Sequence, residues 1–303
     1  MPWSTVRVPA SSANLGPGFD TLGLALGVYL RCRFRRSDAL AIRVAGRDAE
    51  RISTGADNLI WRTAVTVAEN HRATMPPIEL EIANDIPLGR GMGSSAAALT
   101  AGVVIADRLL GLGWKAPRVL DEAARLEGHP DNVAACTLGS ITASAIDSGG
   151  VARAVRIELP QQFSVGLVVP DFELPTTHSR SVLPDCYSAA DAVFNVQRAA
   201  LLVAALATGS TAAFPAALED RFHQPFRASL VPGFDEVLKL RAPGLLGCAL
   251  SGAGPSIVVF FERGHGSVCG LVQQIFRLHG HNSEALVAPI AEHGFEVMEE
   301  AAG

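Results

Sequence analysis

The sequence predicts an α+β protein built from two domains, and three observations lead to this prediction. The chain has 303 residues, which is more than one small hydrophobic core needs. Apolar residues make up 49% of the chain and charged residues 18%, the balance of a globular rather than a disordered protein. Strand-like and helix-like segments are mixed along the chain, without the regular alternation that predicts a parallel sheet.

Strands are predicted where β-branched or aromatic residues alternate with other residues. In the first half of the chain they are Val6–Val8, Tyr29–Arg35, Leu40–Val44, Ile78–Ile82 and Ser140–Ile146. In the second half they are Val155–Leu159, Val165–Val169, Leu245–Leu250 and Ile257–Phe261. The turn Ser148-Gly149-Gly150 places a domain boundary near residues 149–156. We therefore expect an N-terminal domain of residues 1–153 and a C-terminal domain of residues 154–303.

Helices are predicted where apolar residues recur at helical spacing. They cover Asn58–Asn70, Ser95 to about Leu110, Arg118–Glu127, a segment after Pro184 that ends near Thr208, and Val268–Leu278. Asp57 or Asn58 can cap the first of these helices. The second is rich in alanine and apolar on most faces, so we expect it to be buried.

Charge, cysteine content and hydropathy exclude several classes of protein. The formal net charge is −5, from 25 basic and 30 acidic residues, so no nucleic-acid partner is expected. The five cysteines form no CxxC pair, which argues against a disulfide framework or a zinc site. No signal sequence is recognised, and the longest strongly apolar helical stretch, Ala199–Ala207, is shorter than the ~20 residues that span a bilayer. We expect a cytoplasmic protein with no membrane partner.

The segment NDIPLGRGMGSS, residues 84–95, runs directly into the alanine-rich helix. Gly89, Gly91 and Gly93 allow sharp turns and a close approach of the backbone to a ligand. Ser94 and Ser95 fall in the first helical turn, where free N–H groups and the helix dipole favour an anion. The segment therefore predicts a phosphate site. The alternative is a tight strand-to-helix turn with Ser94 as an ordinary N-cap.

Two other phosphate-binding loops do not fit this segment. A Walker A loop requires GxxxxGK[ST], and the only lysines are Lys115 and Lys239. Residues 91–96 match the dinucleotide pattern GxGxxA, but the link NDIPL separates them from the preceding strand, and the nearest acid, Asp107, lies inside the helix. A nicotinamide enzyme is therefore disfavoured. Without a loop lysine, backbone amides, Arg90 and Mg²⁺ would balance the phosphate charge, with a serine and a carboxylate as metal ligands.

Three parts of the chain together resemble the GHMP kinase family. They are PASSANLGPGFDTLGLAL at residues 9–26, PLGRGMGSSAA at 87–97 followed by EGHPDNVAA at 127–135, and ALSGAGPS at 249–256. Within the family, PASSANLGPGFD and EGHPDN resemble the homoserine kinases more than the mevalonate, galactose or shikimate kinases. The resemblance implies a ribosomal protein S5 domain 2-like N-terminal domain, a ferredoxin-like C-terminal domain and a homodimer. It also implies transfer of the γ-phosphoryl group of ATP to the hydroxyl of L-homoserine, a step of threonine biosynthesis.

The same resemblance implies the site residues. ATP would lie on the loop Pro87, Leu88, Gly89, Arg90, Gly91, Met92, Gly93, Ser94 and Ser95, with Gly252 and Gly254 closing over it. The zwitterionic acceptor would contact Asn14, Asp20, His129, Asn132, Thr176, Arg180 and Arg227. Asp20 would take its ammonium or its hydroxyl, and an arginine suits its carboxylate because a guanidinium binds that group in a bidentate fork. Mg²⁺ would be held by Glu127 with Ser95 or Ser94, and Glu122 is a second candidate.

Each assignment has a structural alternative. Asn14 and Asp20 could be turn residues beside glycines, and His129 a satisfied buried histidine. Arg227 could be a solvated surface arginine, Glu122 and Glu127 surface glutamates, and the glycines of SGAGPS a plain hairpin turn.

The expected mechanism departs from that of the mevalonate-type kinases. Those enzymes pair a lysine near the N-terminus with an aspartate that can act as general base. This chain has no such lysine, and either Asn132 or Asp131 occupies the corresponding place. We therefore hypothesise transfer without a dedicated base, in which the acceptor proton leaves late.

Two other functions stay open at this point. One is a kinase of the same family with a different small alcohol as acceptor, which Asp20, Arg180 and Arg227 argue against. The other is a non-catalytic sensor of ATP and a metabolite on the same fold. Ser95 and Glu127 argue against a sensor, because sensing does not require a metal site.

Overall fold

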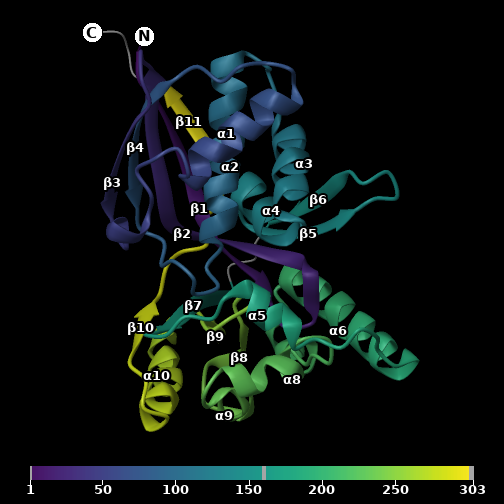
Figure 1. The fold of residues 1–303 in the computed structure, drawn as a ribbon. Helices are drawn as coiled ribbons and strands as arrows, with labels where there is room; N and C mark the ends of the chain where they lie inside the picture. The colour runs from purple at the N-terminus through teal and green to yellow at the C-terminus, as the bar shows by residue number, and fades with distance from the viewer. Residues whose placement is uncertain (1, 159–161, 300–303) are drawn as a thin grey trace.

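The computed structural model describes residues 2–158 and 162–299, which contain two β-sheets (Figure 1). The larger sheet, in the upper part of the figure, has seven strands in the order β11-β1-β2-β4-β3, with β5 paired to β2 and β6 to β5. Its strands are β1 (Ser4–Asn14), β2 (Gly18–Arg36), β3 (Ala41–Gly46), β4 (Ile78–Asn84), β5 (Ile141–Ile146), β6 (Ala152–Ile157) and β11 (Glu296–Glu299). β3 runs parallel to β4, whereas the other pairs are antiparallel.

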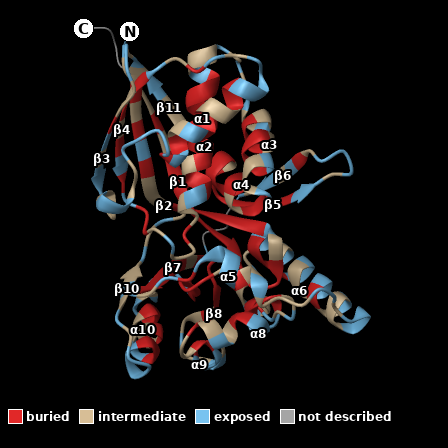
Figure 2. Ribbon diagram, viewed as in Figure 1, coloured by how far each residue is buried: buried red, intermediate tan, exposed pale blue. Residues whose placement is uncertain are grey.

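Helices α1 (Leu59–Asn70), α2 (Ser94–Leu110), α3 (Ala116–Glu127) and α4 (Asp131–Leu138) pack together beside this sheet. The Asn58 side chain caps α1 by accepting from the backbone N–H groups of Ile60 and Trp61. α2 lies in the middle of the layer and is buried along most of its length (Figure 2), as its alanine-rich sequence predicts. This helix starts at the loop that the sequence assigns to phosphate.

The smaller sheet, in the lower part of Figure 1, has the order β10-β7-β9-β8. Its strands are β7 (Phe163–Pro170), β8 (Leu245–Leu250), β9 (Ile257–Glu262) and β10 (Ser283–Leu286). Its helices are α5 (Thr176–Ser181), α6 (Ala189–Thr208), α7 (Phe214–Ala217), α8 (Gln224–Arg227), α9 (Phe234–Lys239) and α10 (Cys269–Leu278). The long β1–β2 hairpin, purple in Figure 1, reaches from the upper sheet to this lower part.

The α+β class is confirmed, and each predicted strand and helix has a counterpart, although Leu159 lies outside the described residues. The main differences are omissions: α4, α5, α7–α9, β10 and β11 were not predicted. β2 is also much longer than the predicted Tyr29–Arg35, because its first part pairs with β1 and β5 and its last part with β1 and β4.

The expected domain division stays a prediction, and the strand pairing bears on where it would fall. β6 pairs with β5 in the first sheet, so a cut between residues 153 and 154 would divide β6. The chain also returns to the first sheet at its end, where β11 pairs with β1.

α6 is longer than the apolar stretch expected at Ala199–Ala207. It runs for 20 residues with a mean hydropathy of 1.4, and only 22% of its most apolar window is buried. Val193, Val196 and Leu201 are exposed on it. By length and composition this helix could cross a membrane, but one such helix is weak evidence for a span.

Candidate active site

A cavity of about 310 Å³ lies between the helices beside the larger sheet and the loops of the smaller one. Most of the predicted site residues line it together: Asn14, Asp20, Gly89, Arg90, Gly91, Met92, Gly93, Ser94, Ser95, Glu127, His129, Asn132, Thr176, Arg180, Arg227 and Gly252. Asp131, Leu174, Pro175 and Ala253 complete the lining. Residues that are more than 200 positions apart in the sequence therefore meet at one site.

The glycine loop enters α2 through a backbone that only glycine fits well. Gly93 is the N-cap of α2 with a φ of 66°, and Ser94 is the first helical residue. A Cβ atom on Gly93 would lie 1.9 Å from the Ser11 Oγ atom. A Cβ atom on Gly91 would lie 2.2 Å from the Ser251 carbonyl oxygen. Both glycines are therefore required by close contacts as well as by positive φ.

Three loops are joined at this point. The Ser251 hydroxyl donates to the carbonyl oxygen of Gly91 at 2.5 Å, and the Ser11 N–H donates to that of Met92 at 3.1 Å. The Gly252 N–H donates to the carbonyl oxygen of Ala13 at 2.9 Å. The glycine loop, the end of β1 and the β8–β9 turn thus form one wall.

Arg90 carries an unused donor in this wall. Its Nη1 atom donates to the carbonyl oxygen of Pro170 at 2.9 Å, which ties the loop to β7. Its Nε atom is buried and has no hydrogen-bond partner among the described residues. A buried donor beside a helix N-terminus fits an anionic ligand.

A second cavity of about 360 Å³ adjoins the first, since Ser94 and Ser95 line both. Its walls are largely apolar and come from β2, β4, α1 and the segment before α1. They include Leu30, Ile52, Leu59, Ile60, Ile82 and Leu88 together with Asn58 and Asn84. This cavity was not predicted from the sequence, because its residues come from separate segments without a common motif. Of its described lining, Leu88, Ser94 and Ser95 were predicted to belong to the site.

The predicted metal ligands are adjacent. The Ser95 hydroxyl donates to Glu127 Oε2 at 3.1 Å. Burial raises the pKa of Glu127, although His129 and the Ser95 hydrogen bond oppose that shift. Oxygen ligands of this kind are those that Mg²⁺ prefers, so the pair fits the ion.

Glu122, the second metal candidate, is placed elsewhere. It is 3% exposed, and its two carboxylate oxygens accept from Arg118 and Arg125. Its burial contradicts the alternative of a surface glutamate. Its ion pairs and its absence from the described lining of the cavity favour Glu127 over Glu122 as the metal ligand. Another acidic group, Asp20 with His129 and Asp131, has ligand atoms within 4.8 Å of one another. That set includes an imidazole and is already engaged in ion pairs, so it suits Mg²⁺ less well than Ser95 and Glu127.

Asp20 and Arg180 contact each other in the cavity. Arg180 Nη2 lies 2.7 Å from Asp20 Oδ1, and Nη1 lies 3.1 Å from Oδ2, so the pair is bidentate. The hydrogen bonds to Asp20 raise the pKa of Arg180. Asp20 has a positive φ of 52° and donates its N–H to the side chain of Asn14. The side chain of Asn14 in turn donates to the carbonyl oxygen of Gly252 at 2.8 Å, so Asn14 holds the β1–β2 turn.

Arg227 is the largest fully buried side chain of the described residues, at 1% exposure, which contradicts the surface alternative. Its Nε atom donates to the carbonyl oxygen of Ser179 at 3.1 Å, and its Nη1 atom to that of Gly252 at 3.3 Å. No carboxylate lies within ion-pair distance of it in the described part of the chain. Burial lowers its pKa to about 10, so it remains a cation near neutral pH. A buried cation without an acidic partner, in the wall of a cavity, fits an anionic ligand.

His129 and Asn132 lie at the start of α4. His129 Nδ1 is 2.7 Å from Asp131 Oδ1, and the same oxygen accepts from the Asn132 N–H. Burial lowers the pKa of His129, but the Asp131 carboxylate and its acidic neighbours outweigh burial and raise it. The Ser11 hydroxyl donates to Asn132 Oδ1, which leaves the Asn132 amino group for a ligand.

The remaining predicted residues divide into two groups. Thr176 and Arg180, four positions apart on α5, both line the cavity. Pro87 and Gly254 are absent from the described lining of both cavities: Pro87 is buried, and Gly254 packs near Leu250 and Leu174. Phe19 was not predicted, yet its ring lies 5.6 Å from the guanidinium carbon of Arg180 and 5.5 Å from that of Arg227.

Comparisons with known proteins identify the family of this chain. The model of the GHMP kinase N-terminal domain matches residues 58–140, and that of the GHMP kinase C-terminal domain matches residues 202–267. The chain belongs to the GHMP kinase family, whose members use ATP.

Two relatives with established names indicate the group within that family. The chain is 74% identical over 295 residues to the homoserine kinase of Solibacter usitatus, covering 97% of each chain. It is 45% identical over 260 residues to the homoserine kinase of Deinococcus radiodurans, covering 86% of this chain and 84% of that one. Within the GHMP kinases it belongs with the homoserine kinases.

Solved structures place the fold in the same group. The crystal structure of homoserine kinase from Cytophaga hutchinsonii superposes with a TM-score of 0.85 at 29% identity, covering 98% of both chains. A Lactococcus lactis galactokinase complexed with galactose has a TM-score of 0.68 at 15% identity, covering 97% of this chain and 95% of that one. The second likeness is one of fold alone.

Proposed function

We propose that this protein is a homoserine kinase, which transfers the γ-phosphoryl group of ATP to the hydroxyl of L-homoserine and so produces O-phospho-L-homoserine for threonine biosynthesis. The observation that carries the proposal is the buried Arg227 in the wall of a cavity that is also lined by a glycine loop at a helix N-terminus. The cavity therefore offers charged side chains to an amino acid and backbone N–H groups to phosphate. The curated relatives have the same named activity.

The charged residues suggest how the zwitterion binds. Its carboxylate would lie against Arg227 and Arg180, and its ammonium against Asp20. Asp20 and Arg180 neutralise each other in the cavity, so substrate would share or exchange these contacts without leaving either charge unpaired. The Asn132 amino group, His129 and Thr176 would border the substrate on the sides that these charges leave open.

ATP would extend across both cavities. The apolar second cavity would take the base, and Ser94 and Ser95, which line both cavities, would mark the place where the phosphates pass towards the acceptor. Ser95 and Glu127 would hold Mg²⁺, which supplies positive charge for the phosphate oxygens during transfer. The loop N–H groups and Arg90 would bind the remaining phosphate charge.

The transfer itself would rely on positioning rather than on a strong base. Asp131 is the candidate for a general base, but its Oδ1 atom accepts hydrogen bonds from both His129 and the Asn132 N–H. We therefore retain the hypothesis that the acceptor proton leaves late. Asp131→Asn should keep turnover within about tenfold of wild type, since base catalysis is typically worth more than that. Loss of turnover in a folded variant that still binds both substrates would refute this hypothesis.

A coupled ADP-release assay tests the function. Mg-ATP would be offered with homoserine, mevalonate, shikimate, galactose or serine in turn. Turnover on homoserine alone supports the proposal, whereas turnover on another alcohol would keep the kinase and discard the substrate. ATP binding without turnover on any acceptor would favour a sensor.

We also propose a cytoplasmic homodimer. Its support is the family resemblance together with the exposed apolar residues Val193, Val196 and Leu201 along α6, which a second copy could cover. Sedimentation of the wild type and of Val196→Glu tests this, because a charge in the contact should shift a dimer to monomers. A monomeric wild type would refute the dimer.

A further inference from the structure

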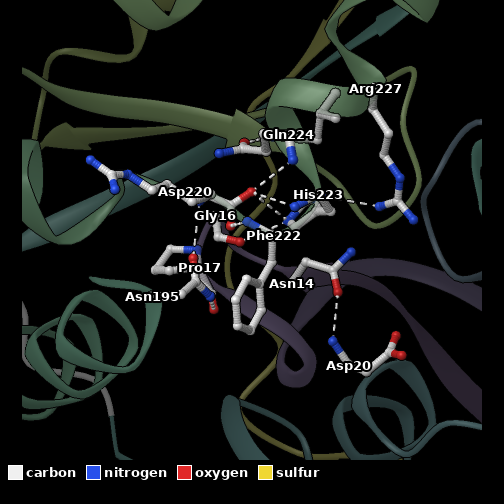
Figure 3. A network of polar contacts seen from close by, with 12 residues as sticks. Asn14, Gly16, Pro17, Asp20, Asn195, Asp220, Phe222, His223, Gln224 and Arg227 are labelled. Atoms are coloured by element: carbon white, nitrogen blue, oxygen red, sulfur yellow. Dashed lines mark hydrogen bonds and ion pairs between the residues drawn. The ribbon is translucent and has the colours of Figure 1, made fainter. Parts of the chain in front are cut away.

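His223 is a fully buried histidine that the proposed reaction does not use, and its ring joins Arg227 of the cavity wall to the β1–β2 turn (Figure 3). Its Nε2 atom lies 2.7 Å from the carbonyl oxygen of Gly16, and its Nδ1 atom lies 3.0 Å from Nη1 of Arg227. Because a carbonyl can only accept, Nε2 must carry a proton and donate it. Nδ1 of the neutral ring is then the acceptor for Arg227, which fixes one tautomer.

The backbone around His223 is held by a buried aspartate. Both carboxylate oxygens of Asp220 accept backbone N–H groups, from Phe222 at 2.8 Å, from His223 at 3.1 Å and from Gln224 at 2.7 Å. Asp220 Oδ2 is 3.4 Å from His223 Nε2, farther than the Gly16 oxygen. The carboxylate therefore fixes the segment rather than competing for the ring proton.

A second contact ties this segment to the β1–β2 turn. The Asn195 side chain donates to the carbonyl oxygen of Pro17 at 2.8 Å and accepts from the Arg221 N–H at 3.1 Å (Figure 3). Phe19 stacks on the His223 ring at 5.3 Å with an interplanar angle of 25°. The residue after Phe19 is Asp20. The His223 ring therefore contacts Arg227 on one side and, on the other, the β1–β2 turn that leads to Asp20.

We propose that His223 is a positioning residue for the amino-acid acceptor. It holds the Arg227 guanidinium at a fixed position relative to Asp20, so that the carboxylate and the ammonium of homoserine bind at the same time. The Nε and Nη1 atoms of Arg227 donate hydrogen bonds to Ser179, Gly252 and His223, which leaves Nη2 for the ligand. This inference rests on the proposed function. Burial lowers the pKa of His223, and the charged groups that act on it are Asp220, Arg227 and Asp20. A neutral ring is required, because a protonated Nδ1 could not accept from Arg227.

The test compares kcat/KM for homoserine with kcat/KM for 3-aminopropan-1-ol, which is homoserine without its carboxylate. The ratio of the two values is independent of the fraction of folded enzyme, so a merely structural role would not move it. In His223→Gln the amide can still donate to Gly16, but the acceptor for Arg227 is lost; we expect the ratio to fall about tenfold. In His223→Asn the side-chain oxygen can replace Nδ1, and the ratio should stay within about threefold of wild type.

Asp107→Ala is the matched control. Asp107 is a buried polar residue at the far end of α2 that accepts from the Trp114 N–H, so its loss should reduce stability and leave the ratio unchanged. If His223→Gln keeps the wild-type ratio, or if His223→Asn loses as much as His223→Gln, the positioning role is overturned. If the wild type does not prefer homoserine to the aminoalcohol, the proposed function itself fails.

A measurement on the wild type covers the case in which the variants do not fold. With ¹⁵N-labelled histidine, His223 should appear as the neutral Nε2–H tautomer at pH 7, and its Nδ1 resonance should move when homoserine is added to the enzyme. A charged ring or the Nδ1–H tautomer would overturn the proposal.

Discussion

Replacing Gly93 by alanine should impair ATP use far more than it impairs folding. The new Cβ atom would lie 1.9 Å from Ser11 Oγ, whereas ordinary contacts begin at 3.4 Å. Either the loop moves by about 1.5 Å or Ser11 rotates and gives up its hydrogen bond to Asn132. Both responses displace groups that face the phosphates and the acceptor. Because a displacement of ~1 Å near reacting groups can cost about 100-fold, we expect kcat/KM for ATP to fall by about that factor.

Gly111, at the other end of the same helix, supplies the control. Its φ of 68° nearly equals the 66° of Gly93, but a Cβ atom on it would meet nothing within 4 Å. Alanine at either position forces a non-glycine residue into the left-handed region, at about 1–2 kcal/mol. Gly111→Ala should therefore lower the Tm while leaving kcat/KM for ATP within about twofold of wild type.

Steady-state ADP release at saturating homoserine and varied Mg-ATP measures the difference, with thermal unfolding of both variants alongside. Ser11→Ala in the Gly93→Ala background removes the clashing oxygen, so this double variant should approach the activity of Ser11→Ala alone. Equal kcat/KM values for Gly93→Ala and Gly111→Ala would refute the role assigned to the loop.

The other predictions concern the metal, the carboxylate and pH. Glu127→Gln should raise the Mg²⁺ concentration needed for half-maximal activity by about 10–100-fold, whereas Glu122→Gln should lower the Tm and leave the Mg²⁺ titration unchanged; equal titrations would contradict the metal site. Arg227→Lys should lower kcat/KM for homoserine about 100-fold, since an ammonium cannot keep the hydrogen bonds to Ser179, Gly252 and His223 and contact the ligand as well, while the KM for ATP stays within about twofold; a matched loss for ATP would place Arg227 outside the acceptor site. The folded-state pKa of His223 is lowered, so its contribution to the unfolding free energy is complete above the unfolded value near 6.5 and is lost as the pH falls below it. Urea titrations from pH 7 to pH 5 should therefore show a smaller loss of stability in His223→Gln than in wild type, and parallel curves would contradict this assignment.

The elements that were predicted correctly depend on local patterns. Asn58 caps α1 because its side chain reaches N–H groups two and three residues ahead, and such a cap is visible in sequence. Ile78–Ile82 alternates because one face of β4 is buried. The glycine loop was recognisable for the same reason, since free N–H groups and positive φ angles are local properties.

The parts that were left open or missed depend on distant contacts. Arg227 was predicted as a site residue only through the family resemblance, because it lies between a proline and a turn and has the sequence context of a surface residue. Its burial follows from the approach of Ser179 and Gly252. The second cavity could not be predicted either, because Leu30, Ile82 and Leu59 come together only when β2, β4 and α1 pack. Local secondary-structure propensity contains no information about contacts between residues that are distant in the sequence.

This chain and the galactokinase share a fold, and Arg227 would explain why they take different ligands. The galactokinase likeness shows that the same architecture holds a neutral sugar in another protein. In this chain a neutral alcohol would leave Arg227 buried and without an anion, since no carboxylate of the described residues pairs with it. Leaving a buried charge unpaired costs about 3–5 kcal/mol, which corresponds to a discrimination of more than 100-fold. A zwitterion avoids that cost at Arg227 and offers Asp20 an ammonium in addition. Selectivity for an amino acid would thus come from the penalty that its buried arginine imposes on neutral alcohols, while the glycine loop contributes equally to any acceptor.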